Sequence, residues 1–301
     1  MSSEPHDGRR AIERDGLSYL PRFISVAEGE QLIEYFAALR PIWERRHSSD
    51  DHGRPGAGSR RITRPVYWLG AWQFASLGYY AEPHFREDRC VRGEPFPTVI
   101  NDILARLRPV LDRHDCSAVD DPIPNTCLIN YYGSTHGGRQ PVDQARLRMH
   151  RDGEPGPVLM FCIGQPGLFE FVEPDRPETP ELALWTRHRS VLVFSGPRFK
   201  DQLYHRLLRV RHGTKPSMRC SVEDFALRRV SISFRHVPRE LISDFGELPQ
   251  DSREQVGGYV RELAQSSDHY ARQLATDPLL QAERPPVERS EQSERSEQSE
   301  H

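Results

Sequence analysis

The stretch RLRMHRDGEPGP, residues 146–157, places His150 two residues before Asp152 and just ahead of a segment rich in glycine and proline. In a strand, residues i and i+2 project from the same face, about 6.5 to 7 Å apart along the chain. An imidazole and a carboxylate on one face can therefore bind the same cation. The motif alone is weak, because a chain with 13 histidines contains roughly one His-x-Asp by chance.

A second, distant histidine would complete a triad of two histidines and one carboxylate, which holds Fe(II) on one side and leaves coordination positions open. Six histidines follow Asp152: His188, His205, His212, His236, His269 and His301. His188 lies in the expected turn TRHRS, and His212 lies in the loop RHGTK. His205 opens the strand-like stretch QLYHRLLRV, where a side chain can face into a barrel mouth. We choose His205, although spacing alone leaves the other histidines open.

A second set of polar residues that could take part in chemistry lies in RRVSISFRHV, residues 228–237. Alternate residues give it one apolar face and one polar face, the polar face being Arg229, Ser231, Ser233 and Arg235. On an edge strand the polar face would simply be solvated. In a barrel whose outer face packs on helices it must point inward, where two arginines are costly unless they meet carboxylates. Because guanidinium groups pair with carboxylates, an acidic small molecule is a candidate partner.

The elements that would carry these residues lie between residues 126 and 237. Short runs rich in β-branched and aromatic residues follow one another there, separated by glycine, proline and charged turns: 126–132, 146–150, 158–164, 168–172, 182–186, 190–196, 202–210 and 228–237. Eight short strands with this punctuation predict an antiparallel barrel or jelly roll. With helices on both sides, the predicted fold class is α+β with a β core.

Two helices are predicted before the strand region. Apolar residues recur at three- and four-residue spacing over 27–40 and 97–114. Pro97 suits the first turn of the second helix, whereas Pro109 is expected to kink or split that helix.

The C-terminal part is predicted to be helical and then disordered. Residues 251–280 favour one or two helical pieces, interrupted at Gly257 and Gly258. The repetitive stretch ERSEQSERSEQSEH, residues 288–301, has no apolar residue and should not fold. We divide the chain into an N-terminal helical and loop segment packing on the core (1–63), a substrate lid with a supporting helix (64–125), a jelly-roll core (126–240), a C-terminal helical segment (241–281) and a disordered tail (282–301).

Composition excludes several classes of protein. The net charge is −3 over 301 residues, which gives no sign of a generally basic nucleic-acid-binding domain. No apolar run reaches the roughly 18 residues of a membrane span, and residues 1–16 have no apolar signal region. The five cysteines are odd in number and widely spaced, as in a reducing compartment. We expect a cytoplasmic monomer without membrane contact.

From residue 65 to 237, and most closely from 126, the chain resembles the AlkB-like branch of the Fe(II)/2-oxoglutarate-dependent dioxygenases. The matching motifs run in order along the chain: NYY (130–132), HRD (150–152), LYH (203–205) and RRVSISFR (228–235). The 55-residue separation of His150 from His205 is close to the usual interval in that family. The ordered set is far more specific than any one motif.

This resemblance implies a double-stranded β-helix (jelly roll) that uses Fe(II), 2-oxoglutarate and O₂. It implies that His150, Asp152 and His205 ligate the iron and form the catalytic centre. It further implies that Arg229 binds the distal carboxylate of 2-oxoglutarate and that Arg235 lies near its metal-chelating end. Further polar contacts to the cosubstrate would come from Asn130, Tyr132 and Ser231. The implied reaction couples decarboxylation of the keto acid to hydroxylation of a C–H bond, with release of formaldehyde when that carbon is an N-methyl group.

Two features depart from the family pattern. Residues 133–149 are longer than the usual short turn, so a loop is inserted near the predicted site. Relatives often carry asparagine where this chain has Ser231, so the polar contacts of the cosubstrate should differ. Neither departure removes a predicted ligand.

The region 64–83 is rich in aromatic residues and resembles the lid that covers the target base in AlkB-like repair enzymes. By that resemblance Trp72, Tyr79 and Glu154 would contact the substrate, although aromatic residues in this region could equally be core packing. The leading hypothesis is oxidative demethylation of alkylated bases in DNA or RNA. The alternatives are a hydroxylase of a small metabolite or protein side chain on the same metal core, and a catalytically inactive binding module.

Overall fold

The computed structural model describes two compact units, residues 1–244 and 245–301. The structure describes residues 4–43, 45–49, 55–61, 64–70, 91–136, 140–238, 245–247 and 250–282. The predicted disordered tail, 282–301, lies outside these ranges except for Ala282.

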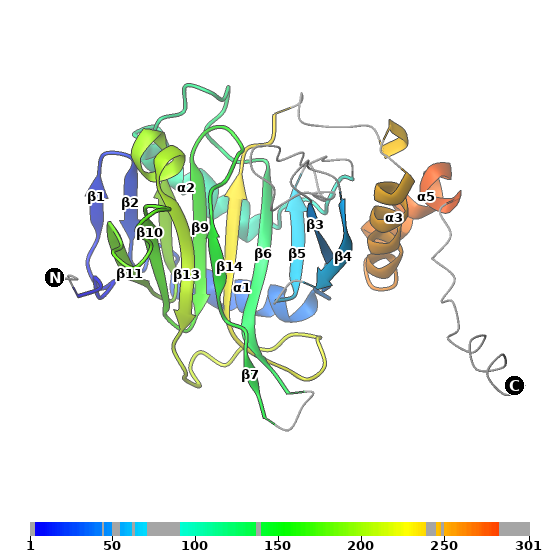
Figure 1. Ribbon diagram of the computed structural model, residues 1–301, viewed down its shortest axis with the longest axis horizontal. Helices are drawn as coiled ribbons and strands as arrows, with labels where there is room; N and C mark the ends of the chain where they lie inside the picture. The colour runs from blue at the N-terminus through cyan, green and yellow to red at the C-terminus, as the bar shows by residue number, and fades with distance from the viewer. Residues whose placement is uncertain are drawn as a thin grey trace, which may run out of the picture. The chain divides into compact units, whose positions relative to one another are not determined.

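The first unit is built on a large antiparallel sheet of eight strands. Six of its strands follow the order β1-β2-β12-β9-β14-β6 from one edge, β5 lies beyond β6, and β7 pairs with the end of β6 (Figure 1). The strands are β1 Ile12–Arg14, β2 Leu17–Leu20, β12 Ser190–Phe194, β9 Val158–Gly164, β14 Phe225–Arg235, β6 Thr126–Thr135, β5 Val66–Gly70 and β7 Val142–Asp143.

A smaller sheet of four strands, in the order β11-β10-β13-β8, completes the jelly roll. Its strands are β11 Leu182–Thr186, β10 Gly167–Val172, β13 Tyr204–Val210 and β8 Leu147–His150, and a short π-helix, η1 Pro197–Gln202, leads into β13. Side chains from both sheets form one apolar core, including Tyr19, Met160, Phe171 and Leu192. All eight strands predicted from the sequence are present, and the predicted fold class is confirmed.

The sequence did not predict the strands at the two margins of the large sheet. Residues 1–63 were expected to be helix and loop, but β1 and β2 extend the sheet beyond β12 through antiparallel pairing. Residues 64–125 were expected to be lid and helix, but β5 pairs with β6 as part of the core sheet. These strands lie outside the β-rich region that the sequence marks, and their pairing with neighbouring strands defines them. A further pair, β3 Arg45–Ser49 and β4 Pro55–Arg61, forms a separate hairpin.

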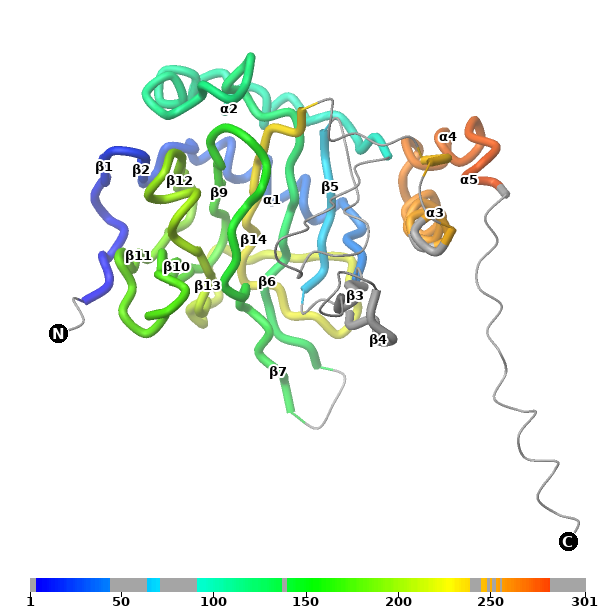
Figure 2. Tube along the Cα trace, turned by 45° about the horizontal axis from the view of Figure 1, so that its top comes forward, coloured from blue at the N-terminus to red at the C-terminus, as the bar shows by residue number. Residues whose placement is uncertain are grey.

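Helices α1 Val26–Ala38 and α2 Thr98–Leu111 lie on the outer side of the large sheet (Figure 2). A capping box at Ser25 and Glu28 starts α1, and Glu28 also pairs with Arg106 of α2. The expected break at Pro109 is a helix end instead, because α2 stops two residues later at Leu111.

The second unit consists of η3 Phe245–Glu247 and three helices, α3 Gln250–Ala264, α4 Asp268–Thr276 and α5 Pro278–Ala282. The predicted interruption at Gly257 and Gly258 is wrong, since α3 runs through both glycines. Val256, Val260 and Leu263 of α3 are buried in one stripe, and this burial outweighs the cost of about 1 kcal/mol for each helical glycine. None of the described helices is long and apolar enough to cross a membrane.

A buried polar cluster joins the end of α2 to the large sheet. His114 Nε2 lies 2.9 Å from Ser18 Oγ on β2, and its Nδ1 lies 2.8 Å from Ser195 Oγ just after β12. Burial lowers the pKa of His114 to about 4, and the positive charge of Arg113 acts in the same direction. The folded protein therefore holds this imidazole neutral between two hydroxyl groups.

The His114 cluster should make folding stability depend on pH. Between about pH 6.5 and about pH 4, His114 is protonated in the unfolded chain but stays neutral in the folded chain. The neutral imidazole therefore contributes roughly 3 kcal/mol to the free energy of unfolding above pH 6.5, and this contribution is lost as the pH falls from 6.5 to 4. Urea unfolding of the wild type and of His114→Gln across this range measures it. The variant should lose less stability on acidification, and parallel pH curves would contradict the assignment.

Candidate metal centre

The pairing of two strands in the small sheet brings the predicted ligands together. β13 and β8 are antiparallel, and their register places His205 directly opposite His150. Asp152 follows two residues after β8 ends. One potential ligand atom from each of the three side chains lies within 4.8 Å of the others, and the described ranges contain no second cluster of this kind.

His150 is held in the form that can bind a metal. Its Nδ1 donates to the main-chain carbonyl of Arg148 at 2.9 Å, which leaves the lone pair on Nε2. Burial lowers the pKa of His150 to about 3, and the neighbouring His205 acts in the same direction. The ring is therefore neutral at physiological pH.

Asp152 is held as a carboxylate by an arginine from the large sheet. Arg235 Nε donates to Asp152 Oδ1 at 2.7 Å, and both side chains are buried. Burial alone would raise the pKa of Asp152, but the charge of Arg235 outweighs it and holds that pKa well below its usual range. Arg235 also lies 3.6 Å from Glu154 Oε2, so one guanidinium faces two carboxylates.

His205 is fixed in orientation by aromatic rings of the core. Phe169 stacks on it with ring centroids 5.6 Å apart, and Phe194 contacts it edge-on at 5.0 Å. Its Nε2 lies 3.3 Å from Asp152 Oδ2. Two adjacent ligand atoms on one octahedral ion at about 2.1 Å lie about 3 Å apart, so this spacing fits two ligands of one cation.

The three side chains fit a bound divalent metal. Asp152 Oδ2 is buried, and no described residue forms a hydrogen bond with it. An ionised buried oxygen of this kind is costly unless a cation satisfies it. Together with the Nε2 atoms of His150 and His205, it would supply the donor set typical of non-haem Fe(II). Their role as ligands stays a prediction.

A small cavity, with about 20 Å³ of space for the centres of water-sized groups, lies between the two sheets beside this cluster. Its walls combine the three candidate ligands with apolar side chains and a few hydroxyl groups: Tyr132, Leu147, His150, Asp152, Val158, Met160, Phe169, Phe194, His205, Leu207, Ser231 and Ser233. Of the five residues predicted to contact the cosubstrate, Tyr132 and Ser231 line this cavity.

Arg229, predicted to bind the distal carboxylate of 2-oxoglutarate, is fully buried behind Ser231. It donates four hydrogen bonds, to Ser231 Oγ, Thr186 Oγ1 and the carbonyls of Gln165 and Thr186. Among the described residues no carboxylate pairs with it, so its charge is solvated by dipoles alone. Gly167 allows this packing, because a Cβ there would lie 3.1 Å from the Arg229 guanidinium carbon. Its role in binding the cosubstrate stays a prediction.

The other histidines that the sequence left open do not join the cluster. His188 accepts a hydrogen bond from the main-chain N–H of Gly164, and His212 is exposed beside Asp143. His269 lies in α4 of the second unit, and His301 lies outside the described residues.

The predicted substrate contacts are only partly described. Glu154 is buried beside Arg235, and Lys200 of η1 donates to its main-chain carbonyl. Trp72 and Tyr79 of the predicted lid lie outside the described residues.

Of the inserted segment, 133–149, the described part includes the end of β6, the short strand β7 and the start of β8. β6 continues to Thr135, which pairs with Val142 of β7. This hairpin projects beyond the rest of the sheet (Figures 1 and 2).

Sequence reasoning missed Arg64, a buried residue just before β5. Its Nε donates to Asn130 Oδ1 at 2.6 Å, and its guanidinium lies over the Tyr132 ring, 5.7 Å from the centroid. Nothing in the local sequence marks it, since it stands beside other arginines in SRRITRP. Only the pairing of β5 with β6 brings it to these two residues.

Comparison with known proteins identifies the family. Residues 16–235 match the sequence model of the 2OG-Fe(II) oxygenase superfamily. A search of curated proteins found no match. Among solved structures the chain is similar to OsALKBH1, with 14% identity, a TM-score of 0.49, and coverage of 76% of this chain and 100% of that one. It is also similar to an oxidoreductase of the 2OG-Fe(II) oxygenase family from Burkholderia pseudomallei, with 14% identity, a TM-score of 0.43, and coverage of 77% and 95%.

Replacing His205 should remove metal binding. His205→Ala takes away one of three ligands, and even changes around a ligand cost about 10–100-fold in affinity, so Fe(II) or Mn(II) should bind more than 100-fold more weakly. Metal content after dialysis and titration with Mn(II) measure the loss. His188→Ala and His212→Ala serve as controls and should bind metal normally. A His205→Ala protein that keeps its iron would contradict the choice of third ligand.

Replacing Arg229 should affect both the cosubstrate and the fold. Arg229→Ala should raise the 2-oxoglutarate concentration needed for half-maximal turnover by at least tenfold. It should also lower the Tm, because two buried carbonyls lose their donors at a cost of about 1–3 kcal/mol each. Arg229→Lys, which keeps the charge, should have a 2-oxoglutarate requirement and a Tm between those of the wild type and Arg229→Ala. A lowered Tm with an unchanged 2-oxoglutarate requirement would leave Arg229 a structural role only.

Proposed function

Because the chain belongs to the 2OG-Fe(II) oxygenase superfamily, and is therefore an Fe(II)/2-oxoglutarate-dependent dioxygenase, we propose that it demethylates alkylated bases in nucleic acid. The superfamily uses Fe(II), 2-oxoglutarate and O₂, which together supply the oxidising power for C–H hydroxylation. In this chain His150, Asp152 and His205 would hold the metal. Asn130, Tyr132, Arg229, Ser231 and Arg235 would hold the keto acid. This AlkB-like substrate class is a proposal that goes beyond the family assignment.

The observation that carries the proposal is a group of arginines beside the metal-bearing strand. We call Arg146, Arg148, Arg209 and Arg211 the arginine surface. All four are exposed, they lie on or next to the paired strands β8 and β13, and among the described residues none has a carboxylate partner. Arg146 and Arg148 lie four and two residues before His150, and Arg209 and Arg211 lie four and six residues after His205. Positive charge that no described carboxylate neutralises, so near two candidate ligands, favours a polyanionic ligand despite the net charge of −3.

Two members of the arginine surface are held in place by a tryptophan. Arg209 and Arg211 both lie over the ring of Trp185 on β11, with guanidinium carbons 5.6 and 4.2 Å from the ring centroid. The ring stabilises both cations without neutralising them. Phosphate groups of a nucleic-acid strand would supply the missing negative charge.

Aromatic and aliphatic side chains line much of the cavity beside the candidate ligands. Tyr132, Phe169 and Phe194 contribute aromatic surface, and Leu207 and Met160 contribute aliphatic surface. A base drawn out of its stack is held among side chains of these kinds, so a base at the mouth of this cavity would meet a suitable surface. Asp152 and His205, on the same cavity wall, would then face the N-methyl group, whose hydroxylated product loses formaldehyde.

The test uses the Fe(II)-loaded protein with 2-oxoglutarate and a single-stranded oligonucleotide carrying N-methylated bases. We expect one formaldehyde and one succinate per demethylated base. The unmethylated oligonucleotide and the His205→Ala protein serve as controls and should give no formaldehyde. Arg146→Glu with Arg209→Glu should raise the KM for the oligonucleotide and weaken its salt dependence, whereas Arg14→Glu, on β1 at an edge of the large sheet, should not.

Other outcomes would assign other functions. Succinate without demethylation, followed by product formation from a metabolite or peptide, would overturn the nucleic-acid proposal in favour of a hydroxylase on the same metal core. Bound iron with no succinate under any condition would indicate a binding module without catalysis.

A further inference from the structure

Arg64 is a buried arginine on the margin of the cosubstrate region. It is 9% exposed, and among the described residues no carboxylate pairs with it. Its one hydrogen bond to a described residue goes from Nε to Asn130 Oδ1 at 2.6 Å. This bond and the contact of its guanidinium with the Tyr132 ring both go to residues of the predicted cosubstrate set.

The register of the sheet connects Arg64 to the cavity. Asn130 pairs with Val66 of β5 on one side and with Ser231 of β14 on the other. Ser231 and Tyr132 both line the cavity, and the Arg64 guanidinium lies over the Tyr132 ring. Arg64 therefore contacts two residues of the predicted cosubstrate set from behind.

The chemistry of the contact fixes the orientation of the Asn130 amide. A guanidinium group has only donors, so the atom that faces Arg64 must be the amide oxygen. The amide nitrogen then lies on the opposite branch of the side chain. The nitrogen donates one hydrogen to the Leu128 carbonyl, with Nδ2 3.5 Å from the oxygen, and no other described residue accepts its second hydrogen. An amide turned the other way would present its oxygen to an anion and repel it.

We propose that Arg64 is a positioning residue for 2-oxoglutarate, which holds the Asn130 side chain so that its N–H group, and not its carbonyl, faces a carboxylate of the cosubstrate. The inference depends on the cosubstrate of the superfamily and not on the proposed nucleic-acid substrate. If the test of Arg64 fails, the proposed nucleic-acid substrate is unaffected, and if the nucleic-acid proposal fails, the role of Arg64 is unaffected.

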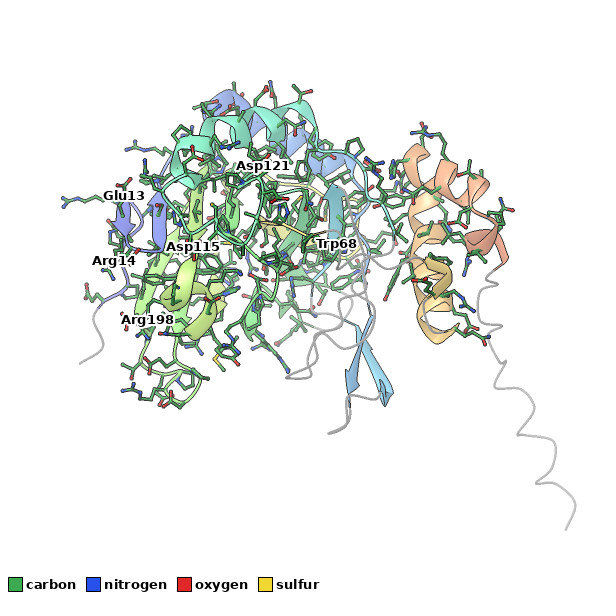
Figure 3. All side chains as sticks on the ribbon, turned by 90° about the horizontal axis from the view of Figure 1, so that it is seen from above. Glu13, Arg14, Trp68, Asp115, Asp121 and Arg198 are labelled. Carbon is green, nitrogen blue, oxygen red and sulfur yellow. The ribbon has the colours of Figure 1, made fainter. Side chains whose placement is uncertain are left out.

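The test measures cosubstrate binding without turnover. Protein loaded with Mn(II) in place of Fe(II) is titrated with 2-oxoglutarate by calorimetry. Arg64→Met should weaken 2-oxoglutarate binding by roughly tenfold, the effect of losing one well-oriented hydrogen bond to a charged group, and should leave Mn(II) affinity unchanged. Arg64→Lys should restore part of the affinity. Arg14→Met, on β1 at the opposite edge of the same sheet from Trp68 of β5 (Figure 3), removes an exposed arginine and should bind as the wild type.

A double variant separates positioning from a direct effect of charge. If Arg64 acts through Asn130, then Arg64→Met should cost little further affinity in an Asn130→Ala background. Additive losses would overturn the proposal, because Arg64 would then act on the cosubstrate by its own charge. Wild-type affinity in Arg64→Met would overturn it as well.

Asn130→Asp covers the case in which Arg64→Met does not fold. This variant keeps an acceptor for Arg64, and so should keep or raise the Tm, but it replaces the N–H donor by a negative charge. It should lose 2-oxoglutarate affinity by at least tenfold while it still binds Mn(II). Unchanged affinity in this folded variant would show that the Asn130 N–H group does not face the cosubstrate, and would overturn the proposal.

Discussion

The antiparallel pairing of β8 with β13 is the constraint on which the site depends. The two strands are separated by more than fifty residues in sequence, but their register puts His150 directly opposite His205. The register is held because the inward faces carry apolar core residues, and a slip of either strand by one residue would turn its histidine to the outer surface. The stacking of Phe169 on His205 and the bond from His150 to the Arg148 carbonyl then fix the two rings.

Charge balance around the cavity explains why three buried arginines are tolerated. Arg235 faces two carboxylates, Asp152 and Glu154. Arg229 and Arg64 face none among the described residues and are held by neutral groups. A divalent cation on Asp152 and a dicarboxylate near the other two arginines would satisfy both kinds of buried charge. The same side chains that destabilise an empty site therefore favour binding of metal and keto acid together.

Strands and helices could be predicted where a local sequence pattern marks them, and not where only pairing or packing defines them. Eight strands of the jelly roll were predicted because their apolar runs or alternation extend over four or more residues, as in Val158–Gly164. The strands Ile12–Arg14 and Leu17–Leu20 were missed because they lie outside the β-rich region 126–237, and their pairing with each other and with β12 defines them. The break expected at Gly257 was wrong because packing of Val256 and Val260 outweighs a local preference.

By itself, the sequence determined the residue types of the centre: a His-x-Asp pair, a set of possible second histidines, and two arginines on the polar face of one strand. Only the tertiary structure decided which histidine lies opposite His150, because that depends on strand register and not on spacing. It also decided the contacts of the arginines. It placed Arg235 on the carboxylate of Asp152, buried Arg229 among carbonyls, and brought Arg64 to Asn130. The sequence shows where an arginine stands but not what it contacts, because the strands that pack around a guanidinium group determine its partners.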